Sequence, residues 1–356
     1  ARFADEHTVH VEGSAGATSE IDFEHAVVAT GSRPISIPGF DYADGPVLDS
    51  RQALALTEVP DSLVICGAGY IGLELAGVFA DLGTRVDVVE MLDEALPTYP
   101  DDLTRPVEQS LEERGVDFHF GEAATGWRVS GGEITVTTET EAGEESTYLT
   151  DKVLVAVGRE PVTDTLDLDA VGLEPDEDGF LPVDEQRRTD LDHVFAIGDV
   201  AGEPMLAHAA SAEGIVAAEA IAGDEDAVFD PRAIPAVVYT DPEIATVGMT
   251  ADEATEAGYD PVTGEFPMRA SGRALTTGET EGFVELVADE STGTVLGARM
   301  VGPDAADLSA EFALAVEQQL PLEDVASTIH AHPTVSEAVM EAAENALGQA
   351  INIPNR

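Results

Sequence analysis

Residues 61–90 read DSLVICGAGYIGLELAGVFADLGTRVDVVE: an apolar run, a glycine-rich turn, a longer mixed segment and a second apolar run. Short continuous apolar runs are typical of parallel strands covered on both faces, and the segment between them has the length of a helix. Strand, helix and strand in this order predict a βαβ unit. The stretch therefore predicts a doubly wound α/β domain.

The turn in this stretch has the pattern G-x-G-x-x-G, formed by Gly67, Gly69 and Gly72. The first glycine makes a tight turn, the second lets a pyrophosphate approach the backbone, and the third lets helix and strand pack closely. The free amides at the helix start attract phosphate charge. The pattern predicts a dinucleotide site.

Glu90 ends the second apolar run, eighteen residues after Gly72. A carboxylate at this place accepts hydrogen bonds from a ribose 2′-hydroxyl and repels a 2′-phosphate. Glu90 could also be an ordinary surface acid, because 71 of the 356 residues are acidic. We favour NAD over NADP.

Residues 330–338, HAHPTVSEA, contain a second candidate site. Thr334 and Glu337 fit the T-x-x-E capping box at a helix start. Apolar residues at helical spacing then predict that helix: Val339, Ala342, Ala343 and Leu347. The other interpretation makes His332 an acid/base and Glu337 its orienting carboxylate, and the nine residues alone leave both open.

Asp199 follows the apolar run HVFAI, where the carboxyl end of a parallel strand would meet a ligand. It could equally cap the next helix. His208 lies close by in sequence and alone would be read as structural. Cys66 is the one cysteine, which excludes an intrachain disulfide, and it reads as a small buried hydrophobe.

The chain has 71 acidic and 16 basic residues, a formal net charge of −55, and Lys152 is its one lysine. This charge disfavours nucleic acids and anionic membranes as partners. The acidic residues are spread from end to end, which resembles proteins of salt-loving microbes. No apolar run reaches the length of a membrane span, and we expect a cytoplasmic protein.

Seven motifs occur in the order and at about the spacing of the pyridine nucleotide-disulfide oxidoreductases, and the resemblance covers essentially the whole chain. They are ATGSRP (29–34), GAGYIGLELA (67–76), VAVGREP (155–161), AIGDV (196–200), MLAHAASAEG (205–214), VVYTDPEIATVG (237–248) and HAHPTVSEA (330–338).

The resemblance implies two cofactors, FAD and NAD, and assigns residues to each. The residues implied for FAD are Thr30, Gly31, Ser32, Asp199, Met205, Leu206, Ala207 and His208. The residues implied for NAD are Gly67, Ala68, Gly69, Tyr70, Ile71, Gly72, Leu73, Glu74, Glu90, Ala124 and Gly158. Tyr70 matches a position beside the nicotinamide, where it can act as a gate.

The resemblance also implies the activity, which is that of the lipoamide branch of the family: oxidation of dihydrolipoamide to lipoamide by NAD+, through a redox disulfide and FAD. His332 would be the acid/base and Glu337 its partner, and in a homodimer His332 would serve the flavin site of the other subunit. The dihydrolipoamide would be carried by a lipoyl domain of a 2-oxo-acid dehydrogenase or glycine cleavage complex. A glutathione- or mercuric-reductase-like enzyme is the alternative within the family.

The resemblance further implies two Rossmann-like domains, the first incomplete, and a C-terminal α+β dimerisation domain. We expect the FAD-binding domain at 1–48 and 159–230, the NAD-binding domain at 49–158 and the dimerisation domain at 231–356.

Two features of the family are missing from this sequence: a second G-x-G-x-x-G for the FAD pyrophosphate, and a redox cysteine pair followed by a lysine. We interpret the chain as part of a complete enzyme that has about a hundred more N-terminal residues. Alone it should bind FAD weakly or not at all and show no lipoamide turnover. The alternative is a short protein that acts as a non-catalytic NAD-binding and dimerisation module.

We predict that the fold depends on high salt, because molar cations screen repulsion between the acidic residues down to a Debye length of about 3 Å. Thermal melting followed by circular dichroism in molar and millimolar potassium chloride tests this. The melting temperature should fall by more than about 10 °C at low salt. An unchanged melting temperature would contradict the prediction.

Overall fold

The computed structural model describes residues 1–13, 16–42 and 45–355, so Arg356, the last residue of the predicted dimerisation domain, lies outside them. The chain forms two compact units. The first unit is Ala1–Ile35 with Arg159–Pro231, and the second is Ser36–Gly158 with Arg232–Arg356. Residues 36–48, which we assigned to the FAD-binding segment, fall within the second unit.

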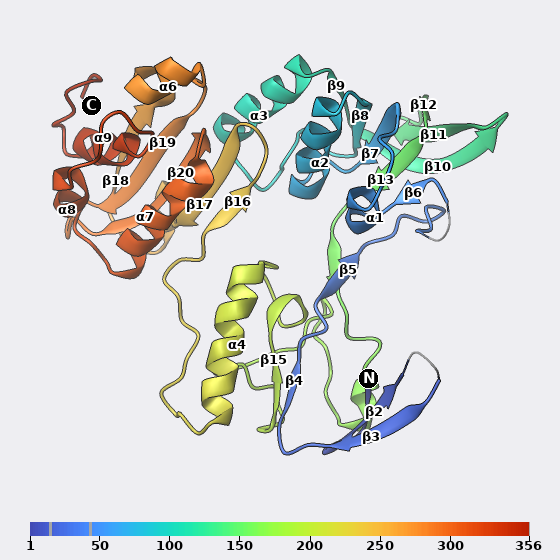
Figure 1. The fold of residues 1–356 in the computed structure, drawn as a ribbon. Coiled ribbons are helices and arrows are strands. Elements are labelled where there is room, and N and C mark those ends of the chain that lie inside the picture. The colour runs from blue at the N-terminus through green and yellow to red at the C-terminus, as the bar shows by residue number, and fades with distance from the viewer. Residues whose placement is uncertain (14–15, 43–44, 356) are drawn as a thin grey trace. The chain divides into compact units, whose positions relative to one another are not determined.

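The first unit joins two distant segments of the chain through short strand pairs (Figure 1). An N-terminal antiparallel sheet contains β1 (Arg2–Asp5), β2 (Thr8–Glu12) and β3 (Thr18–Asp22). The pairs are β4 (Ala26–Val28) parallel to β15 (Val194–Ala196), and β5 (Ser32–Pro34) antiparallel to β14 (Arg159–Pro161). The helices are η1 (Leu168–Ala170), η2 (Gly198–Val200) and α4 (Ala207–Ile221).

The second unit begins with a five-stranded parallel sheet in the order β6-β13-β7-β8-β9, as the βαβ pattern predicts. Its strands are β6 (Val47–Leu48), β7 (Ser62–Cys66), β8 (Arg85–Glu90), β9 (Val116–Phe120) and β13 (Lys152–Val155). The helices are α1 (Ser50–Leu54), α2 (Tyr70–Asp81) and α3 (Asp101–Glu113). An antiparallel sheet contains β10 (Glu122–Ser130), β11 (Glu133–Thr140) and β12 (Glu145–Thr150).

Alternating residues of β7 explain why its sequence is apolar throughout. Leu63 and Ile65 pack in the cluster that contains α2 and α3, whereas Val64 and Cys66 pack in the cluster that contains β11. The parallel sheet is therefore covered by helices on one face and by the antiparallel sheet on the other. Cys66 is buried, as predicted.

The rest of the second unit is an α+β layer built on a five-stranded antiparallel sheet in the order β16-β17-β20-β19-β18. Its strands are β16 (Ala236–Val238), β17 (Glu243–Gly248), β18 (Pro261–Pro267), β19 (Phe283–Asp289) and β20 (Val295–Gly302). The helices are α5 (Ala251–Glu256), η3 (Met268–Ala270), α6 (Gly272–Thr277), α7 (Ala305–Glu317), α8 (Leu322–Ser327) and α9 (Glu337–Ala346).

Arginines connect the two parts of the second unit. Arg299 in β20 donates from Nη1 to Asp102 of α3 at 2.7 Å and from Nε to Glu285 at 2.6 Å. Arg114, just after α3, bonds the carbonyl of Asp241 at 3.1 Å. Within the described residues, no helix is both long and apolar enough to cross a membrane.

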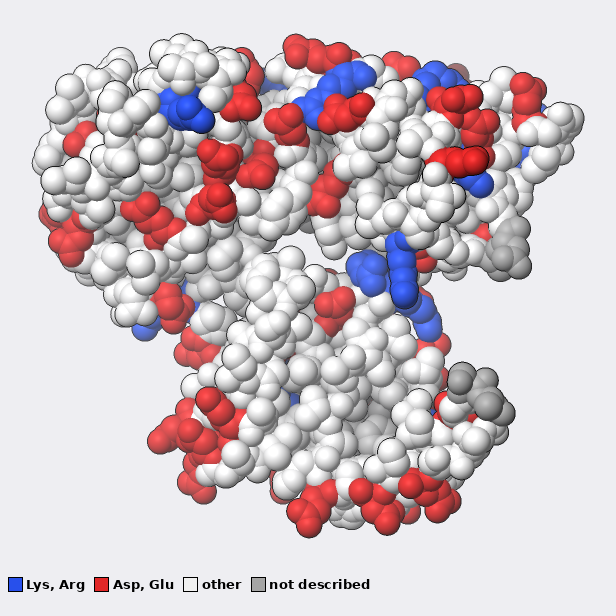
Figure 2. Space-filling view, in the orientation of Figure 1, with Lys and Arg blue, Asp and Glu red and all other residues white. Residues whose placement is uncertain are grey.

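Acidic side chains dominate the charged surface, as the composition requires. Figure 2 shows them spread over the visible face, with basic side chains at a few places only. Several of the few basic side chains form contacts that hold strands and helices together.

We predict that Gly264→Ala destabilises the fold, because a Cβ on Gly264 would lie 2.1 Å from the carbonyl oxygen of Ala342 in α9. Overpacking of this kind costs about 1–3 kcal/mol. Denaturant unfolding in molar potassium chloride measures it. Gly272→Ala is the matched control, since the nearest atom to its Cβ would be 3.8 Å away. Equal stability of the two variants would contradict the prediction.

Candidate functional site

The glycine turn between β7 and α2 has the geometry of a phosphate cradle. Gly67 has φ +107°, and a Cβ there would lie 2.5 Å from the carbonyl oxygen of Ala156. A Cβ on Gly72 would lie 2.1 Å from the carbonyl oxygen of Gly67, whereas a Cβ on Gly69 would have nothing within 4 Å. Gly69 therefore leaves open space at the start of α2, whose first amides have no side-chain cap. A pyrophosphate fits this arrangement.

Glu90 is fixed beside this turn by two backbone amides. Its Oε2 accepts from the N–H of Ala68 at 2.8 Å, and its Oε1 accepts from the N–H of Leu92 at 2.9 Å. Each carboxylate oxygen keeps acceptor capacity for a ribose hydroxyl. The carboxylate thus both supports the turn and presents negative charge at the end of β8.

The other residues implied for NAD include some that are exposed or lie near the turn and some that support it from the core. Tyr70 is exposed at the first position of α2, Gly158 is exposed after β13, and Ala124 packs in the cluster that contains Cys66. Leu73 is fully buried, so its side chain supports the turn from the core. Burial raises the pKa of Glu74, although its carboxyl accepts from the N–H of Tyr239 at 2.9 Å. Glu74 thus holds the loop after β16.

Residues implied for FAD meet in the first unit, around the carboxylate of Asp199. Ser32 donates from Oγ to Oδ2 of Asp199 at 2.5 Å, and Arg159 donates from Nε to the same Oγ at 2.7 Å. Thr30 donates to the carbonyl of Val162 at 2.6 Å, and Gly31 lies between these residues with φ +68°.

The start of α4 lies against Asp199. A Cβ on Gly198 would be 3.1 Å from that of Ala210, which places η2 on this helix. Met205 and Leu206 are partly buried, whereas Ala207 and His208 are exposed, and no side chain caps the helix. This cluster fits the ribityl and ring part of FAD. The chain has one G-x-G-x-x-G, in the second unit, so the first unit fits FAD only in part.

His332 and Glu337 form a pair in which the imidazole is exposed and the carboxylate is not. Nδ1 of His332 lies 2.9 Å from Oε1 of Glu337, and the side chains are 77% and 24% exposed. A carboxylate only accepts, so the hydrogen is on Nδ1. Nε2 therefore carries the free lone pair, and none of the described residues bonds to it. The pair presents one basic nitrogen to solvent.

The capping box predicted here is only half right. The N–H of Thr334 donates to Oε2 of Glu337 at 3.0 Å, as the box requires. The hydroxyl of Thr334 instead donates to the carbonyl of Ala331 at 2.7 Å and contacts Ser336, and α9 starts only at Glu337. The helix has no side-chain cap because the turn ahead of it uses the threonine hydroxyl.

Hydrogen bonds to Glu337 keep its carboxylate ionised. Partial burial raises the pKa of Glu337, but bonds from the N–H of Thr334 and from His332 outweigh it, and the pKa lies below its usual value. An ionised carboxylate that accepts a hydrogen bond from Nδ1 of His332 orients the imidazole ring and stabilises its protonated form.

Sequence reasoning missed two residues that support the sites. His330 is buried and its Nε2 lies 3.1 Å from Glu311 of α7, so it holds the segment before His332. Arg159 belongs to the motif VAVGREP, and it contacts Ser32, which lies 127 residues earlier in the sequence. The motif was the available signal for Arg159, whereas nothing in the sequence indicates the partner of His330.

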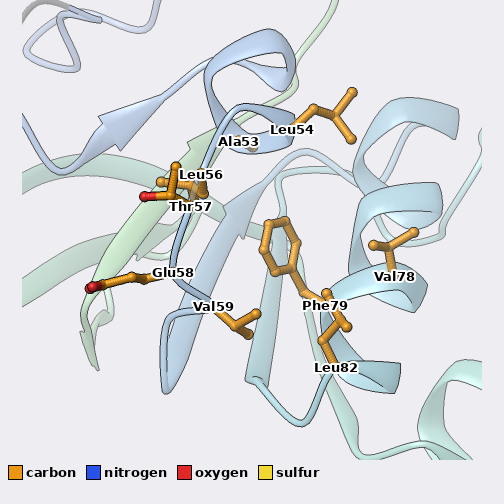
Figure 3. Close-up of a pocket in the computed structure, with 9 residues that line it drawn as sticks. All are labelled: Ala53, Leu54, Leu56, Thr57, Glu58, Val59, Val78, Phe79 and Leu82. Atoms are coloured by element: carbon orange, nitrogen blue, oxygen red, sulfur yellow. The ribbon is translucent and has the colours of Figure 1, made fainter.

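A cavity of about 160 Å³ lies between α1 and α2, away from these residues (Figure 3). Its lining is apolar except for a threonine and a glutamate: Ala53, Leu54, Leu56, Thr57, Glu58, Val59, Val78, Phe79 and Leu82. None of the candidate site residues lines it. Within residues 1–13, 16–42 and 45–355 no acidic, histidine and cysteine side chains cluster as metal ligands.

Comparisons with known proteins agree on one family. Residues 1–214 match the family described as pyridine nucleotide-disulphide oxidoreductase, and residues 234–343 match its dimerisation domain. A dihydrolipoyl dehydrogenase of Halobacterium salinarum is 63% identical, over 97% of this chain and 73% of the relative. One from Geobacillus stearothermophilus is 45% identical, over 99% and 74%.

Solved structures give the same answer. LpdA from Mycobacterium tuberculosis has a TM-score of 0.87 at 30% identity, over 96% of this chain and 74% of that chain. The resemblance and the fold class predicted from the motifs are thereby confirmed. The chain belongs to the pyridine nucleotide-disulphide oxidoreductase family.

Proposed function

We propose that this chain belongs to an NAD-dependent dihydrolipoyl dehydrogenase, a flavoprotein that oxidises dihydrolipoamide to lipoamide with NAD+ as acceptor. The relatives from Halobacterium salinarum and Geobacillus stearothermophilus carry this name. The observation that carries the proposal is the His332–Glu337 pair with its exposed Nε2.

His332 takes a proton from the dithiol. A thiol attacks a disulfide only as thiolate, and imidazole is suited to remove its proton near neutral pH. The proton goes to Nε2, because Nδ1 already donates to Glu337. Glu337 then balances the charge of the imidazolium, and the same nitrogen returns the proton when the direction reverses.

The cofactor sites divide the remaining work between the two units. When bound, FAD would pass an electron pair to NAD+, as hydride, from the dithiol form of a redox cysteine pair, whose disulfide dihydrolipoamide has reduced. Gly69 and the start of α2 would hold the NAD pyrophosphate, and Glu90 the adenine-side ribose. Asp199, oriented by Ser32, would bond the ribityl chain. With Cys66 as its one cysteine, the chain itself supplies no redox disulfide.

Assembly completes the proposal. The dimerisation-domain match supports a homodimer. We assign His332 of each subunit to the flavin site of the other, and the substrate arm to a lipoyl domain of a 2-oxo-acid dehydrogenase or glycine cleavage complex. The exposure of His332 supports this assignment, because an acid/base that serves another subunit must project from its own.

NADH should bind this chain with a dissociation constant at least about tenfold below that of NADPH, because Glu90 repels a 2′-phosphate. Glu90→Gln should bring the dissociation constants of NADH and NADPH closer together. The substitution also removes the negative charge that the N–H groups of Ala68 and Leu92 contact, so it weakens the turn as well. Quenching of protein fluorescence in molar potassium chloride measures both constants. Equal affinities for the two nucleotides in the unaltered chain would contradict the assignment.

His332→Gln in the FAD-loaded holoenzyme should lower kcat for dihydrolipoamide by about 10²-fold or more, the typical cost of a lost acid/base. NADH binding should not change, because the glycine turn is untouched. His10→Gln is the control, since His10 pairs with Glu20 at the surface of the first unit. Full turnover by the His332 variant would refute the role of His332.

A further inference from the structure

We propose that Arg269 and Arg273 form a docking point for the acidic face of the lipoyl-bearing protein domain that brings the dithiol to His332. This inference rests on the function proposed above and adds the surface that recognises the macromolecular substrate. It commits to one occupant, an acidic protein domain, rather than to a small ligand or a second copy of the chain.

The segment that carries these arginines is anchored in the core and adjoins His332. Met268 in η3 and Ala274 in α6 are fully buried, and the Ser271 hydroxyl accepts from the N–H of Ala274 at 3.3 Å. Between them, a Cβ on Gly272 would lie 3.8 Å from Cε1 of His332. Cε1 is the ring carbon between Nδ1 and Nε2, so α6 begins beside the imidazole that takes the proton.

Arg269 and Arg273 are both exposed and four residues apart. In the described parts of the chain neither forms an ion pair, unlike Arg33, Arg114 and Arg299, which contact carboxylates. Figure 2 shows basic atoms beside the region of α6, one of the few places where they appear on a mostly acidic or uncharged face. The segment that adjoins His332 thus carries two exposed arginines that form no ion pair with the described residues.

Charge identifies the partner. Guanidinium groups bind carboxylates through two parallel hydrogen bonds, and contact pairs of this kind persist when salt screens longer-range attraction. The chain as a whole, with a net charge of −55, repels an acidic protein. The carboxylates of an acidic domain are therefore attracted to this chain only where such arginines are exposed.

Shape distinguishes a domain from a small anion. The 160 Å³ cavity lies between α1 and α2, whereas Arg269 and Arg273 project from an exposed segment. An exposed segment suits a protein face. A dithiol on a flexible arm can then reach His332 while the domain that bears it rests on the arginines.

Steady-state kinetics of the holoenzyme tests the proposal with three substrates: a dihydrolipoyl domain with an acidic surface, free neutral dihydrolipoamide and free anionic dihydrolipoate. In the variant Arg269→Gln with Arg273→Gln, KM for the domain should rise about tenfold with little change in kcat. KM for both free substrates should change by less than about twofold. Arg105→Gln with Arg128→Gln is the matched control, because these arginines are exposed on α3 and β10, and it should leave all three substrates unaffected.

Several outcomes would overturn the proposal. An equal change for the domain and free dihydrolipoamide would place the arginines in the chemistry at His332. A change for dihydrolipoate as large as for the domain would indicate a small-carboxylate site, and dissociation to monomers in size-exclusion chromatography a subunit contact. No change in KM for the domain would also refute it. If unaltered holoenzyme does not turn over free dihydrolipoamide, the proposed function itself fails, which is a separate result.

Discussion

Close contact between helices and strands at glycines positions every candidate site in this chain. Gly72 brings α2 so near to the end of β7 that a side chain would meet the carbonyl of Gly67, while Gly69 leaves the turn open to a phosphate. Gly264 likewise lets α9, whose first residue is Glu337, pack closely on β18. Gly198 sets η2 against α4 beside Asp199. The sites thus lie at helix starts that backbone packing has fixed.

The second constraint is the scarcity of cations. The chain has 16 basic residues and 71 acidic ones, so few basic side chains are available for ion pairs. Arg299 and Arg114 tie α3 to the antiparallel layer, and Arg159 orients the serine that bonds Asp199. Arginine suits these places because its planar fork makes several bonds in one geometry. Arginines without such a partner are therefore candidates for contacts with other molecules.

Local patterns predicted the parts of the fold that local physics determines. Apolar runs and the glycine turn at 61–90 predicted the βαβ unit, and HAHPTVSEA indicated the pairing of His332 with Glu337 and the following helix. The Thr334 hydroxyl was assigned wrongly because a tight turn ahead of the helix competes for it. The partner of His330 lies 19 residues away and that of Arg159 lies 127 residues away, and no spacing rule connects either pair. The hydrogen bonds that Glu90 accepts from the N–H groups of Ala68 and Leu92 were missed, because a motif specifies the ligand contact but not the contacts that hold the side chain in place.

Subunit complementation tests most directly the central claim, that His332 is the acid/base of a disulfide-reducing flavoenzyme and serves the other subunit. Inactive His332→Gln holoenzyme is mixed with holoenzyme whose redox cysteines are replaced by serine, and the subunits are exchanged. The account predicts that activity returns to about a quarter of the unaltered rate, because half of the dimers are mixed and each of these has one complete site. Mixed dimers that form but stay as inactive as their parents would contradict it.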